Sequence, residues 1–559
     1  MTSRETLQEK QMAVSAAMRR GDLTSASALA SDARREHPDD AVLAHMAGNI
    51  ALKSGDAEGA AACFASAVKA RPDHFDYVID HAIALQRLGR DQEAIASLSQ
   101  HEAAGLKVAR YANVRAASHR ALGDLAASAH WYDIALSLND RHPLALHGRA
   151  RVALERSEPT ALGLFDRALA VNPGDANLWL GKANALDIEG DHKGAILVAR
   201  QIVDQAPGFM DGLSTLARMR LAQGEEEFAS HYDEAARKQP QNPNIPMEHC
   251  QTLEGAGRSK QAADVAARAQ RDFPDIAHFS MLEALHLGSA GEWDAAETIF
   301  TKLEYETPQR HLHEARHRLR GGTPDQAQER LMKVLKAEPW DIAAWALLGL
   351  AWRAMGDPRK EWLHEQADLV NFLPLQAHST LTEEAVDHLR ELHGRSPFPL
   401  GQSLRGGTQT RAKLFDYASP ILQQLGAAIL ATLEDYRSQL PGSDTTHPLL
   451  RHREEDWRFD GSWSVRLAGG GDHHAAHIHP AGIISSALYL VVPDAVNEEE
   501  HGGWLEIGRP APNLNLDLEP LRTIKPKAGH LALFPSTLYH GTTPFQGGER
   551  MTVAFDVIV

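Results

Sequence analysis

Residues 41–74 read A-V-L-A-H-M-A-G-N-I-A-L-K-S-G-D-A-E-G-A-A-A-C-F-A-S-A-V-K-A-R-P-D-H, and this stretch decides the fold of the first two thirds of the chain. Gly48 leaves room for two helices to approach closely, and Gly55 ends the first helix in a conformation that other residues resist. Phe64 follows between two alanines at helical spacing, and Pro72 stops the second helix. The stretch therefore predicts two helices packed around one aromatic ring.

The same signals recur along the chain in steps of 33 or 34 residues. The turn position is occupied by Gly21, Gly55, Gly89, Gly123, Ser157, Gly190, Gly224, Gly257 and Gly291. Prolines repeat at a similar interval, at Pro38, Pro72, Pro173, Pro207, Pro240, Pro274 and Pro308. A fixed period of about 34 residues is typical of the tetratricopeptide repeat. Residues 1–363 thus resemble an array of about ten such repeats, whereas a plain helical bundle would need no equal intervals.

A single repeat cannot bury its apolar face, so neighbouring repeats must stack into a superhelix. Such arrays usually present a concave groove to a peptide or protein, and we expect a partner of that kind here. Alternatively, the array only dimerises or braces the domain that follows.

The composition narrows the range of partners and compartments. The formal net charge is −17, which disfavours nucleic acid and anionic membranes as partners. The two cysteines, Cys63 and Cys250, lie far apart and predict no disulfide framework. The N-terminus is polar, and no apolar run approaches the roughly 18 residues that a membrane helix needs. We therefore expect a soluble cytoplasmic protein.

The pattern changes after Leu363, where the repeat interval stops. Residues 364–456 predict helices that link the array to the next domain and support it, with a tight loop at residues 402–410 that lines the neighbouring site. From residue 457 to residue 559, short alternating or apolar segments bounded by glycine or proline predict strands of an antiparallel barrel or jelly roll. The expected fold class is α + β, with an N-terminal α-solenoid and a C-terminal jelly roll.

Residues suited to metal chemistry lie within these strands. His477 and His479 are two positions apart, so both imidazoles point to the same side of an extended segment. His540 follows a later apolar strand, and Arg550 stands ten residues after it. A ferrous site that activates O₂ needs three protein ligands on one face. A dicarboxylate cosubstrate needs a cation, and the fork of arginine binds a carboxylate through two hydrogen bonds.

The segment from about Trp463 to Val559 resembles the 2-oxoglutarate/Fe(II) oxygenase superfamily. It is most similar to the prolyl-hydroxylase-like branch and to bacterial proteins that join repeats to such a domain. The resemblance lies in five stretches: S-W-S-V-R-L, H-I-H-P-A-G-I-I-S-S-A-L-Y-L, H-G-G-W-L-E-I, L-A-L-F-P-S-T-L-Y-H and G-E-R-M-T-V-A-F-D-V. It implies a double-stranded β-helix (jelly roll) that uses Fe(II), 2-oxoglutarate and O₂ to hydroxylate a substrate.

The resemblance also implies residue roles. The iron ligands would be His477, His479 and His540, and Arg550 would bind the distal carboxylate of 2-oxoglutarate with help from Thr552 and Tyr489. These histidines and Arg550 would form the catalytic set. Tyr489 as an ordinary core residue of its strand is the alternative.

One departure from the superfamily concerns the third ligand. The superfamily usually has H-x-D or H-x-E, but here the third member is His479. Either three histidines hold the iron, or His479 is a neighbour and water takes that position. Related halogenases place a small residue there, which makes halogenation a minor alternative. His473 and His474 are expected to be loop residues.

Two other functions also fit the sequence. One is a repeat scaffold with a degenerate, metal-free cupin. The other is a three-histidine dioxygenase that needs no 2-oxoglutarate, against which the spacing of Arg550 argues.

Overall fold

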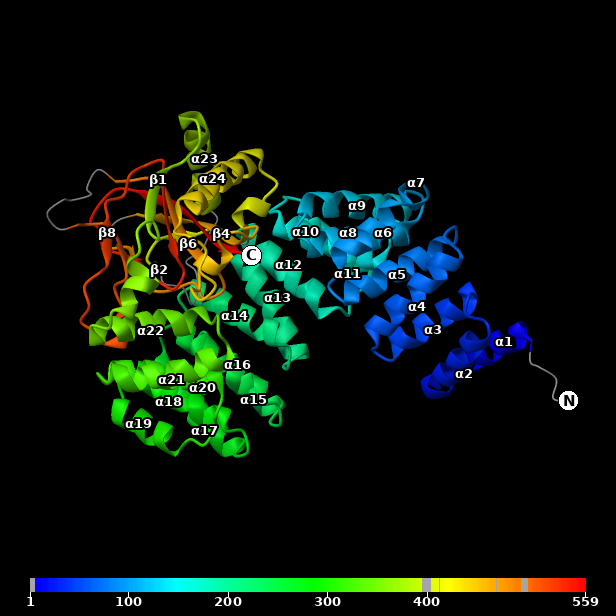
Figure 1. The fold of residues 1–559 in the computed structure, drawn as a ribbon, viewed down its shortest axis with the longest axis horizontal. Coiled ribbons are helices and arrows are strands. Elements are labelled where there is room, and N and C mark those ends of the chain that lie inside the picture. The colour runs from blue at the N-terminus through cyan, green and yellow to red at the C-terminus, as the bar shows by residue number, and fades with distance from the viewer. Residues whose placement is uncertain (1–5, 395–403, 412, 469, 494–500) are drawn as a thin grey trace. The chain divides into compact units, whose positions relative to one another are not determined.

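The computed structural model describes residues 6–394, 404–411, 413–468, 470–493 and 501–559. The chain forms two compact units, residues 1–182 and residues 183–559. Figure 1 shows helices along the first part of the chain and strands concentrated in the last part. The α + β class with N-terminal helical repeats is confirmed, and among the described residues no helix is both long and apolar enough to cross a membrane.

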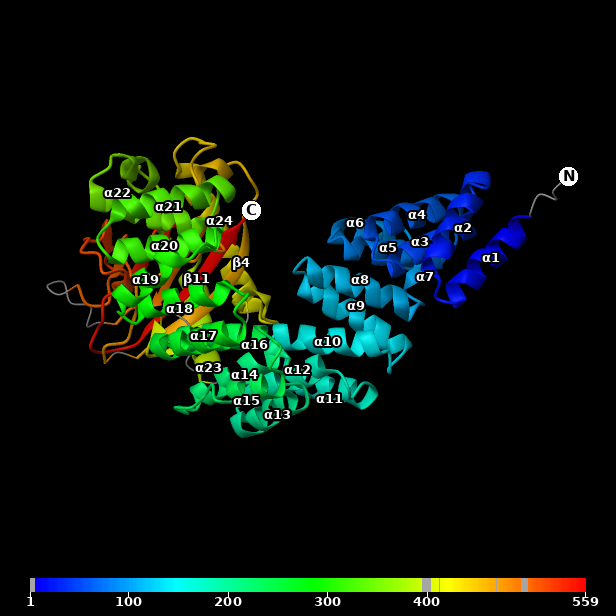
Figure 2. The ribbon, with the colours of Figure 1, turned by 90° about the horizontal axis from the view of Figure 1, so that it is seen from below.

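The repeats are built from antiparallel helix pairs that lie side by side in both ribbon views (Figures 1 and 2). Their helices are α1 (Leu7–Arg19), α2 (Leu23–Glu36), α3 (Ala41–Lys53), α4 (Ala57–Ala70), α5 (Phe75–Arg87), α6 (Asp91–Ser99), α7 (Glu102–Gly105), α8 (Ala109–Ala121), α9 (Leu125–Leu138), α10 (Pro143–Glu155), α11 (Ala161–Val171), α12 (Ala176–Ile188), α13 (His192–Gln205), α14 (Met210–Ala222), α15 (His231–Lys238), α16 (Asn244–Gly255), α17 (Ser259–Asp272), α18 (His278–Ser289), α19 (Trp293–Lys302), α20 (Pro308–Arg320), α21 (Pro324–Ala337) and α22 (Ile342–Met355).

The helix pair α3–α4 has the packing that its sequence predicts. The Phe64 ring is fully buried between Ala60 and Ala67 on α4. A Cβ atom added to Gly48 on α3 would lie 2.5 Å from that ring, so no larger residue fits there. Close contact between the two helices therefore depends on the glycine.

The predicted turn positions share one backbone conformation. Gly55, Gly123 and Gly224 have φ values of 83°, 80° and 77°, and Ser157, which replaces a glycine, also has a positive φ of 51°. The sequence interval thus marks left-handed turns, including the one place where a side chain must adopt that conformation.

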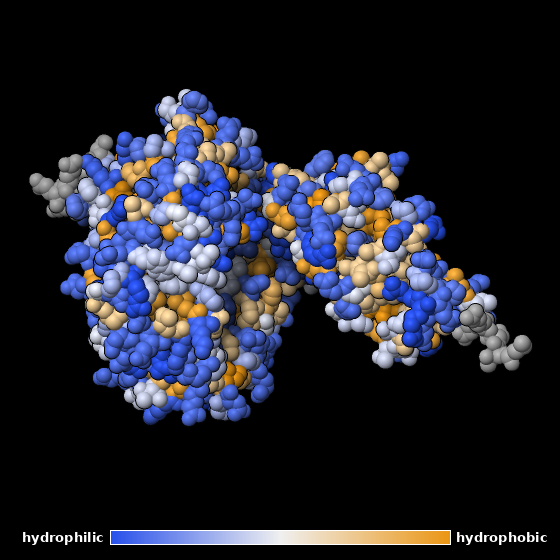
Figure 3. Space-filling model, viewed as in Figure 1, coloured by the Kyte–Doolittle hydropathy of each residue, from blue (hydrophilic) through white to orange (hydrophobic). Residues whose placement is uncertain are grey.

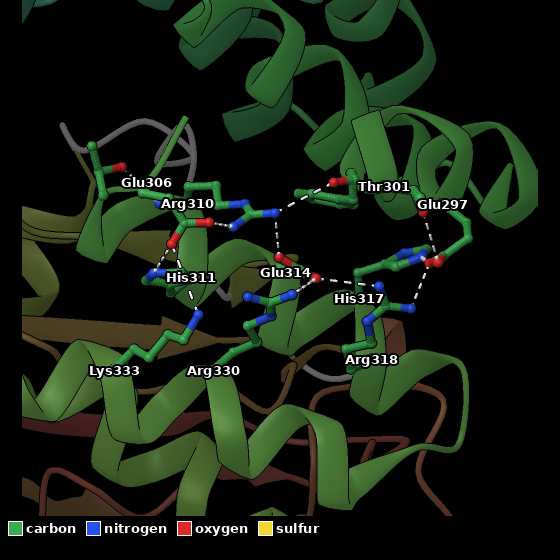
Figure 4. Close-up of polar contacts among 12 residues, drawn as sticks. Glu297, Thr301, Glu306, Arg310, His311, Glu314, His317, Arg318, Arg330 and Lys333 are labelled. Carbon is green, nitrogen blue, oxygen red and sulfur yellow. Dashed lines mark hydrogen bonds and ion pairs between the residues drawn. The ribbon is translucent and has the colours of Figure 1, made fainter. Parts of the chain in front are cut away.

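A network of ion pairs holds the repeats that precede the strands (Figure 4). Glu314 on α20 is almost fully buried and contacts Arg310, Arg318 and Arg330 at 3.0–3.2 Å. Glu297 on α19 binds Arg318 as well. Because buried charges are stable only when paired, this network joins α19, α20 and α21 in one arrangement.

The second part of unit 183–559 consists of strands with two covering helices. Its elements are η1 (Glu361–Glu365), β1 (Asn371–Pro374), α23 (Ser379–His393), β2 (Leu404–Arg405), β3 (Thr408–Gln409), η2 (Leu414–Asp416), α24 (Pro420–Gln439), η3 (Leu450–His452), β4 (Arg458–Leu467), β5 (His473–His474), β6 (Ile484–Val491), β7 (Leu505–Ile507), η4 (Pro512–Leu514), β8 (Arg522–Ile524), β9 (His530–Pro535), β10 (His540–Thr542) and β11 (Arg550–Ile558).

These strands form antiparallel sheets. The largest sheet has the order β1-β9-β6-β11-β4-β3, a second has the order β10-β7-β8, and β2 pairs with β5. After β4, strands β6, β9 and β11 lie in the large sheet and β7, β8 and β10 in the second, and His477 extends the second sheet through a bridge to His540. The chain thus passes repeatedly between two antiparallel sheets. Residues of β7 and β9 share one apolar cluster between the sheets.

One sequence-based expectation for residues 364–456 was wrong. The segment does contain α23 and α24, whose apolar residues cover the outer face of the large sheet. However, Asn371–Pro374 forms β1, which pairs with β9 at the edge of that sheet. Together with β2 and β3, the described part of this segment therefore contributes three strands as well as supporting helices.

The last repeats share a core with the strand region. Leu319 of α20 and Leu348 of α22 lie in one buried cluster with Leu514 and Tyr539, and Ile478 packs against it. The Nε atom of Arg320 donates to the Asn513 carbonyl at 2.8 Å, and Arg353 donates to the carbonyl of Gly508. The face of the molecule shown in Figure 3 is mainly hydrophilic, in keeping with the net charge of −17.

Candidate metal centre and its cavity

Strand β11 divides its side chains between two environments. Because successive strand residues point to opposite faces, alternate positions share one side. Met551, Val553, Phe555 and Val557 lie in the apolar core beneath α23 and α24. Arg550, Thr552, Ala554 and Asp556 line a cavity of about 390 Å³. The strand thus places one cation and one carboxylate in the same cavity.

Three histidines meet in this cavity. The backbones of His477 and His540 are hydrogen-bonded to each other at 3.0 and 2.9 Å, which fixes the two segments side by side. His479 follows two residues after His477 and points to the same side. One nitrogen from each of the three rings lies within 4.8 Å of the others. The structure therefore brings together the three histidines that the sequence singles out.

The outer nitrogen of each ring is held by an oxygen that can only accept a hydrogen bond. The Nδ1 atom of His477 donates to the Ala475 carbonyl at 2.9 Å, and that of His540 donates to the Leu538 carbonyl at 3.2 Å. The Nδ1 atom of His479 donates to the Asp556 carboxylate. With Nδ1 carrying the proton, each neutral ring presents the lone pair of Nε2.

This donor set fits a divalent metal ion. The Nε2 atoms of His477 and His479 lie 2.9 Å apart. Two nitrogen ligands at about 2.1 Å from one ion and roughly at right angles to each other are about 3 Å apart. Two facing lone pairs repel each other unless a cation lies between them. Burial also lowers the pKa of His540 well below its ordinary value of 6.5, which keeps the ring in the neutral form that binds metals.

Arg550 supplies a buried positive charge to the same cavity. Its guanidinium donates to the Gly503 carbonyl at 3.0 Å and to the Tyr489 hydroxyl at 3.3 Å. Within the described part of the chain, no carboxylate forms an ion pair with it, and burial lowers the pKa of Arg550. A buried cation without a counter-ion is costly, so the cavity is built to receive an anion.

Two family models match parts of this chain. Residues 461–556 match a family model described as "Putative 2OG-Fe(II) oxygenase". The tetratricopeptide repeat model matches residues 12–74, 45–107, 146–208 and 249–311. The chain thus combines tetratricopeptide repeats with a C-terminal segment that matches the model of a 2OG-Fe(II) oxygenase domain.

Solved structures similar to this chain include repeat proteins. A tetratricopeptide repeat protein from Parabacteroides merdae has 17% identity and a TM-score of 0.34, covering 43% of this chain and 96% of its own. PilW, a type IV pilus biogenesis factor, has 16% identity and a TM-score of 0.35, with 38% and 100% covered. TTC0263, a repeat protein in Thermus thermophilus, has 21% identity and a TM-score of 0.28, with 32% and 99% covered. No curated protein matches the chain.

The other residues that the sequence singled out occupy different places in the oxygenase domain. Thr552 lines the cavity beside Arg550. Tyr489 is fully buried, is not part of the cavity wall, and accepts a hydrogen bond from Arg550. Its contact with a cosubstrate would therefore be indirect. The segment 402–410, expected to be a tight loop, instead contains strands β2 and β3. Gln409 on β3 lines the cavity, whereas Gln402 and Ser403 lie outside the described residues.

Two polar residues of the cavity wall were missed or misplaced. His473 and His474, expected in a loop, form strand β5 through pairing with β2, and His474 lines the cavity. Asp556 was not singled out, although its spacing from Arg550 and Thr552 gives it the same parity on the last strand. That parity could have identified Asp556 from the sequence. The strand at His473 and His474 could not be identified in this way, because it depends on pairing with the distant segment β2.

Proposed function

We propose that this protein is an Fe(II)- and 2-oxoglutarate-dependent oxygenase of the cytoplasm that hydroxylates a peptide or protein segment recruited by its repeats. One observation carries the proposal. A single cavity holds three converging imidazoles and, on strand β11, a buried guanidinium that forms no ion pair with any described residue. A metal alone would not explain the guanidinium, and an anion alone would not explain the imidazoles.

Each group of residues has a distinct role in this proposal. His477, His479 and His540 hold the iron through Nε2, and Arg550 and Thr552 bind the distal carboxylate of 2-oxoglutarate. Once bound, Fe(II) and 2-oxoglutarate supply the oxidation of a C–H bond by O₂, with succinate and CO₂ as the other products. Val465, Ala487 and Leu505 form apolar parts of the wall and limit water around the cosubstrate.

The repeats of unit 1–182 support a peptide or protein substrate. Tetratricopeptide arrays generally mediate protein–protein interactions. In this unit, a polar row runs across neighbouring helices: the buried Asp80 of α5 binds His45 of α3 at 2.6 Å and the more exposed Arg110 of α8. The exposed part of Arg110 can donate further hydrogen bonds to a bound peptide.

Turnover of 2-oxoglutarate tests the chemistry. The full chain is incubated with Fe(II), 2-oxoglutarate and O₂, and succinate is measured with and without lysate peptides. We expect succinate from the wild type and none from His540→Ala. The matched control is His530→Ala, which removes a histidine on β9 that does not line the cavity.

The outcomes separate the alternatives. No metal binding and no succinate would favour the scaffold function and reject the proposal. Oxidation of a substrate that continues without 2-oxoglutarate, and that survives Arg550→Ala, would favour the three-histidine dioxygenase instead. Mass spectrometry of the lysate peptides identifies the substrate through the gain of one oxygen atom on a defined residue.

A further inference from the structure

Asp556 occupies a particular position in the candidate metal centre. It lies on β11, its carboxylate lines the cavity, and one oxygen accepts the Nδ1 proton of His479. The two side chains are 15% and 13% exposed, so water screens their interaction only weakly. The pair joins residues that are 77 positions apart in the chain.

We propose that Asp556 is a positioning residue that acts through His479 and supplies the negative charge that the three-histidine centre lacks. The inference rests on the proposed function, because it assumes that the histidines hold a metal ion. Asp556 fixes the ring of His479 with Nε2 toward the other two imidazoles. A carboxylate behind a metal-bound imidazole also makes that ring a stronger ligand.

The contrast among the three histidines supports this assignment. The outer nitrogens of His477 and His540 donate to the neutral carbonyl groups of Ala475 and Leu538. The outer nitrogen of His479 donates instead to a carboxylate. It also occupies the position where the superfamily usually has a carboxylate.

Charge counting gives the physical reason. A site of two histidines and one carboxylate gives the metal one negative protein charge. Three neutral imidazoles give none, which leaves the positive charge of the ion uncompensated in a partly buried cavity. With Asp556 the protein again contributes one negative charge, now placed behind the ligand. The substitution of carboxylate by imidazole is thereby offset without a change in total charge.

The ordinary alternative is that Asp556 only attaches β11 to the segment after His477. Both roles predict some loss of stability when Asp556 is replaced. Only the positioning role predicts weaker metal binding in a variant that is still folded, and only while His479 is present. Metal affinity is therefore the decisive readout.

The test uses the full-length, metal-free protein titrated with Co(II), whose visible absorption reports the geometry of the bound ion. Asp556→Asn keeps the shape of the side chain and removes its charge, and Asp556→Ala also removes the acceptor. We expect Co(II) affinity to fall about 10- to 100-fold for Asn and at least as far for Ala. Thermal unfolding of the metal-free variants measures any structural loss separately.

Asp460→Asn is the matched control, because Asp460 lies on the neighbouring strand β4, pairs with Lys413 at 3.3 Å and does not line the cavity. Its affinity for Co(II) should equal that of the wild type. A folded Asp556→Asn variant that binds Co(II) as tightly as the wild type overturns the inference.

A double variant tests whether Asp556 acts through its neighbour. In a His479→Ala background, Asp556→Asn should cause no further loss of Co(II) affinity, because the ring that it orients is gone. A further tenfold loss would show that Asp556 acts in another way and would overturn the inference. If the wild type itself binds no Co(II), the proposed function fails along with the inference. If the wild type binds Co(II) and the Asp556 variants bind it equally tightly, the inference fails but the proposed function stands.

Discussion

Arg550 is stabilised poorly in the free protein. Its described partners are one carbonyl and one phenol, and burial lowers its pKa because the charge is desolvated. Such a buried, unpaired charge lowers the stability of the folded protein, which is common where a buried charge serves to bind a ligand. The cosubstrate carboxylate would remove this cost by pairing with the guanidinium.

The first prediction therefore separates binding from stability at Arg550. Arg550→Met keeps most of the volume and removes the charge. We expect the affinity for 2-oxoglutarate, measured by calorimetry on the Co(II)-loaded protein, to fall by about 2–5 kcal/mol, or roughly 30-fold to several thousand-fold. The unfolding midpoint of the metal-free protein should stay equal or rise.

Tyr489→Phe provides the comparison for Arg550. It removes only the hydroxyl that accepts from Arg550, and Tyr489 does not line the cavity. Its effect on 2-oxoglutarate affinity should be about tenfold or less, the value of one hydrogen bond. An Arg550→Met variant with unchanged 2-oxoglutarate affinity would contradict the assigned role.

The residues of the candidate site differ in how far the sequence could reveal them. His477 and His479 belong to one short motif, and His540 and Arg550 follow recognisable strands, so local patterns indicated all four. The contact between Asp556 and His479 depends on how the segment after His477 lies against β11, 77 residues away. No local pattern encodes that register.

At the scale of elements, α23 is attached to the sheet by a histidine. His393, at the end of the helix, contacts the Thr408 hydroxyl on β3 at 2.9 Å and the Ser464 hydroxyl on β4 at 3.0 Å. Burial lowers the pKa of His393 from 6.5 to about 4. The neutral ring therefore belongs to the folded state, and protonation favours unfolding.

The second prediction follows from the lower pKa of His393 in the folded chain than in the unfolded chain. Between pH 4 and pH 6.5 the unfolded chain binds more protons at His393 than the folded chain, so its contribution to stability is complete above pH 6.5 and is lost as the pH falls toward 4. The loss approaches about 1.4 kcal/mol per pH unit. The gap in unfolding midpoint between the wild type and His393→Gln should shrink from pH 7 to pH 5.

His378→Asn is the control for this measurement, because it changes an exposed histidine at the start of the same helix. A gap between the wild type and His393→Gln that stays constant across this pH range would refute the prediction.

The third prediction concerns the turns between the repeat helices. Ser157 has a left-handed φ of 51° at a position where the other repeats have glycine. Ser157→Gly should stabilise the protein by about 1 kcal/mol because this conformation is strained for a residue with a Cβ atom. The reverse change, Gly123→Ser, should destabilise it by a similar amount, although no atom lies within 4 Å of the added Cβ. Thermal unfolding measures both, and equal midpoints for the Gly123→Ser variant and the wild type would contradict this explanation.

Elements with a strong period were predictable, and short ones were not. The 34-residue interval located the turns, including that at Ser157. Strands β1 and β5 have four and two residues, which is too short for an alternating pattern. Both exist because a partner strand lies beside them: β9 pairs with β1, and β2 pairs with β5. Tertiary pairing decided their conformation over any local preference.

At the scale of unit 183–559, the repeats and the oxygenase domain are not separable by the sequence boundary at residue 363. Asp187 of α12 binds Arg411 at 2.7 Å, and His364 contacts the Thr537 hydroxyl at 3.0 Å. Tyr539 directly precedes His540 in the chain, and Ile478 lies between His477 and His479. Both side chains pack in the apolar cluster with α20 and α22. The repeats thus support the segments that carry the candidate metal ligands.

The fourth prediction is that the oxygenase domain needs these repeats to form its metal centre. A fragment of residues 364–559 would expose Leu514, Tyr539 and Ile478, and each fully exposed apolar side chain forfeits about 1.5–3 kcal/mol. It would also lose the hydrogen bonds from Arg320 and Arg353. We expect this fragment to aggregate or to bind Co(II) at least tenfold more weakly than the full chain.

A fragment of residues 174–559 is the matched comparison, because it begins just before α12 and keeps every contact between the repeats and the strands described above. It should retain the Co(II) affinity of the full chain, while losing the polar row of Asp80, His45 and Arg110 and, with it, the peptide substrate. Circular dichroism and Co(II) titration of both fragments decide the question. If residues 364–559 fold and bind Co(II) like the full chain, the repeats serve recruitment alone. If they do not, the last repeats are a structural part of the oxygenase, and loss of substrate from the longer fragment assigns recruitment to unit 1–182.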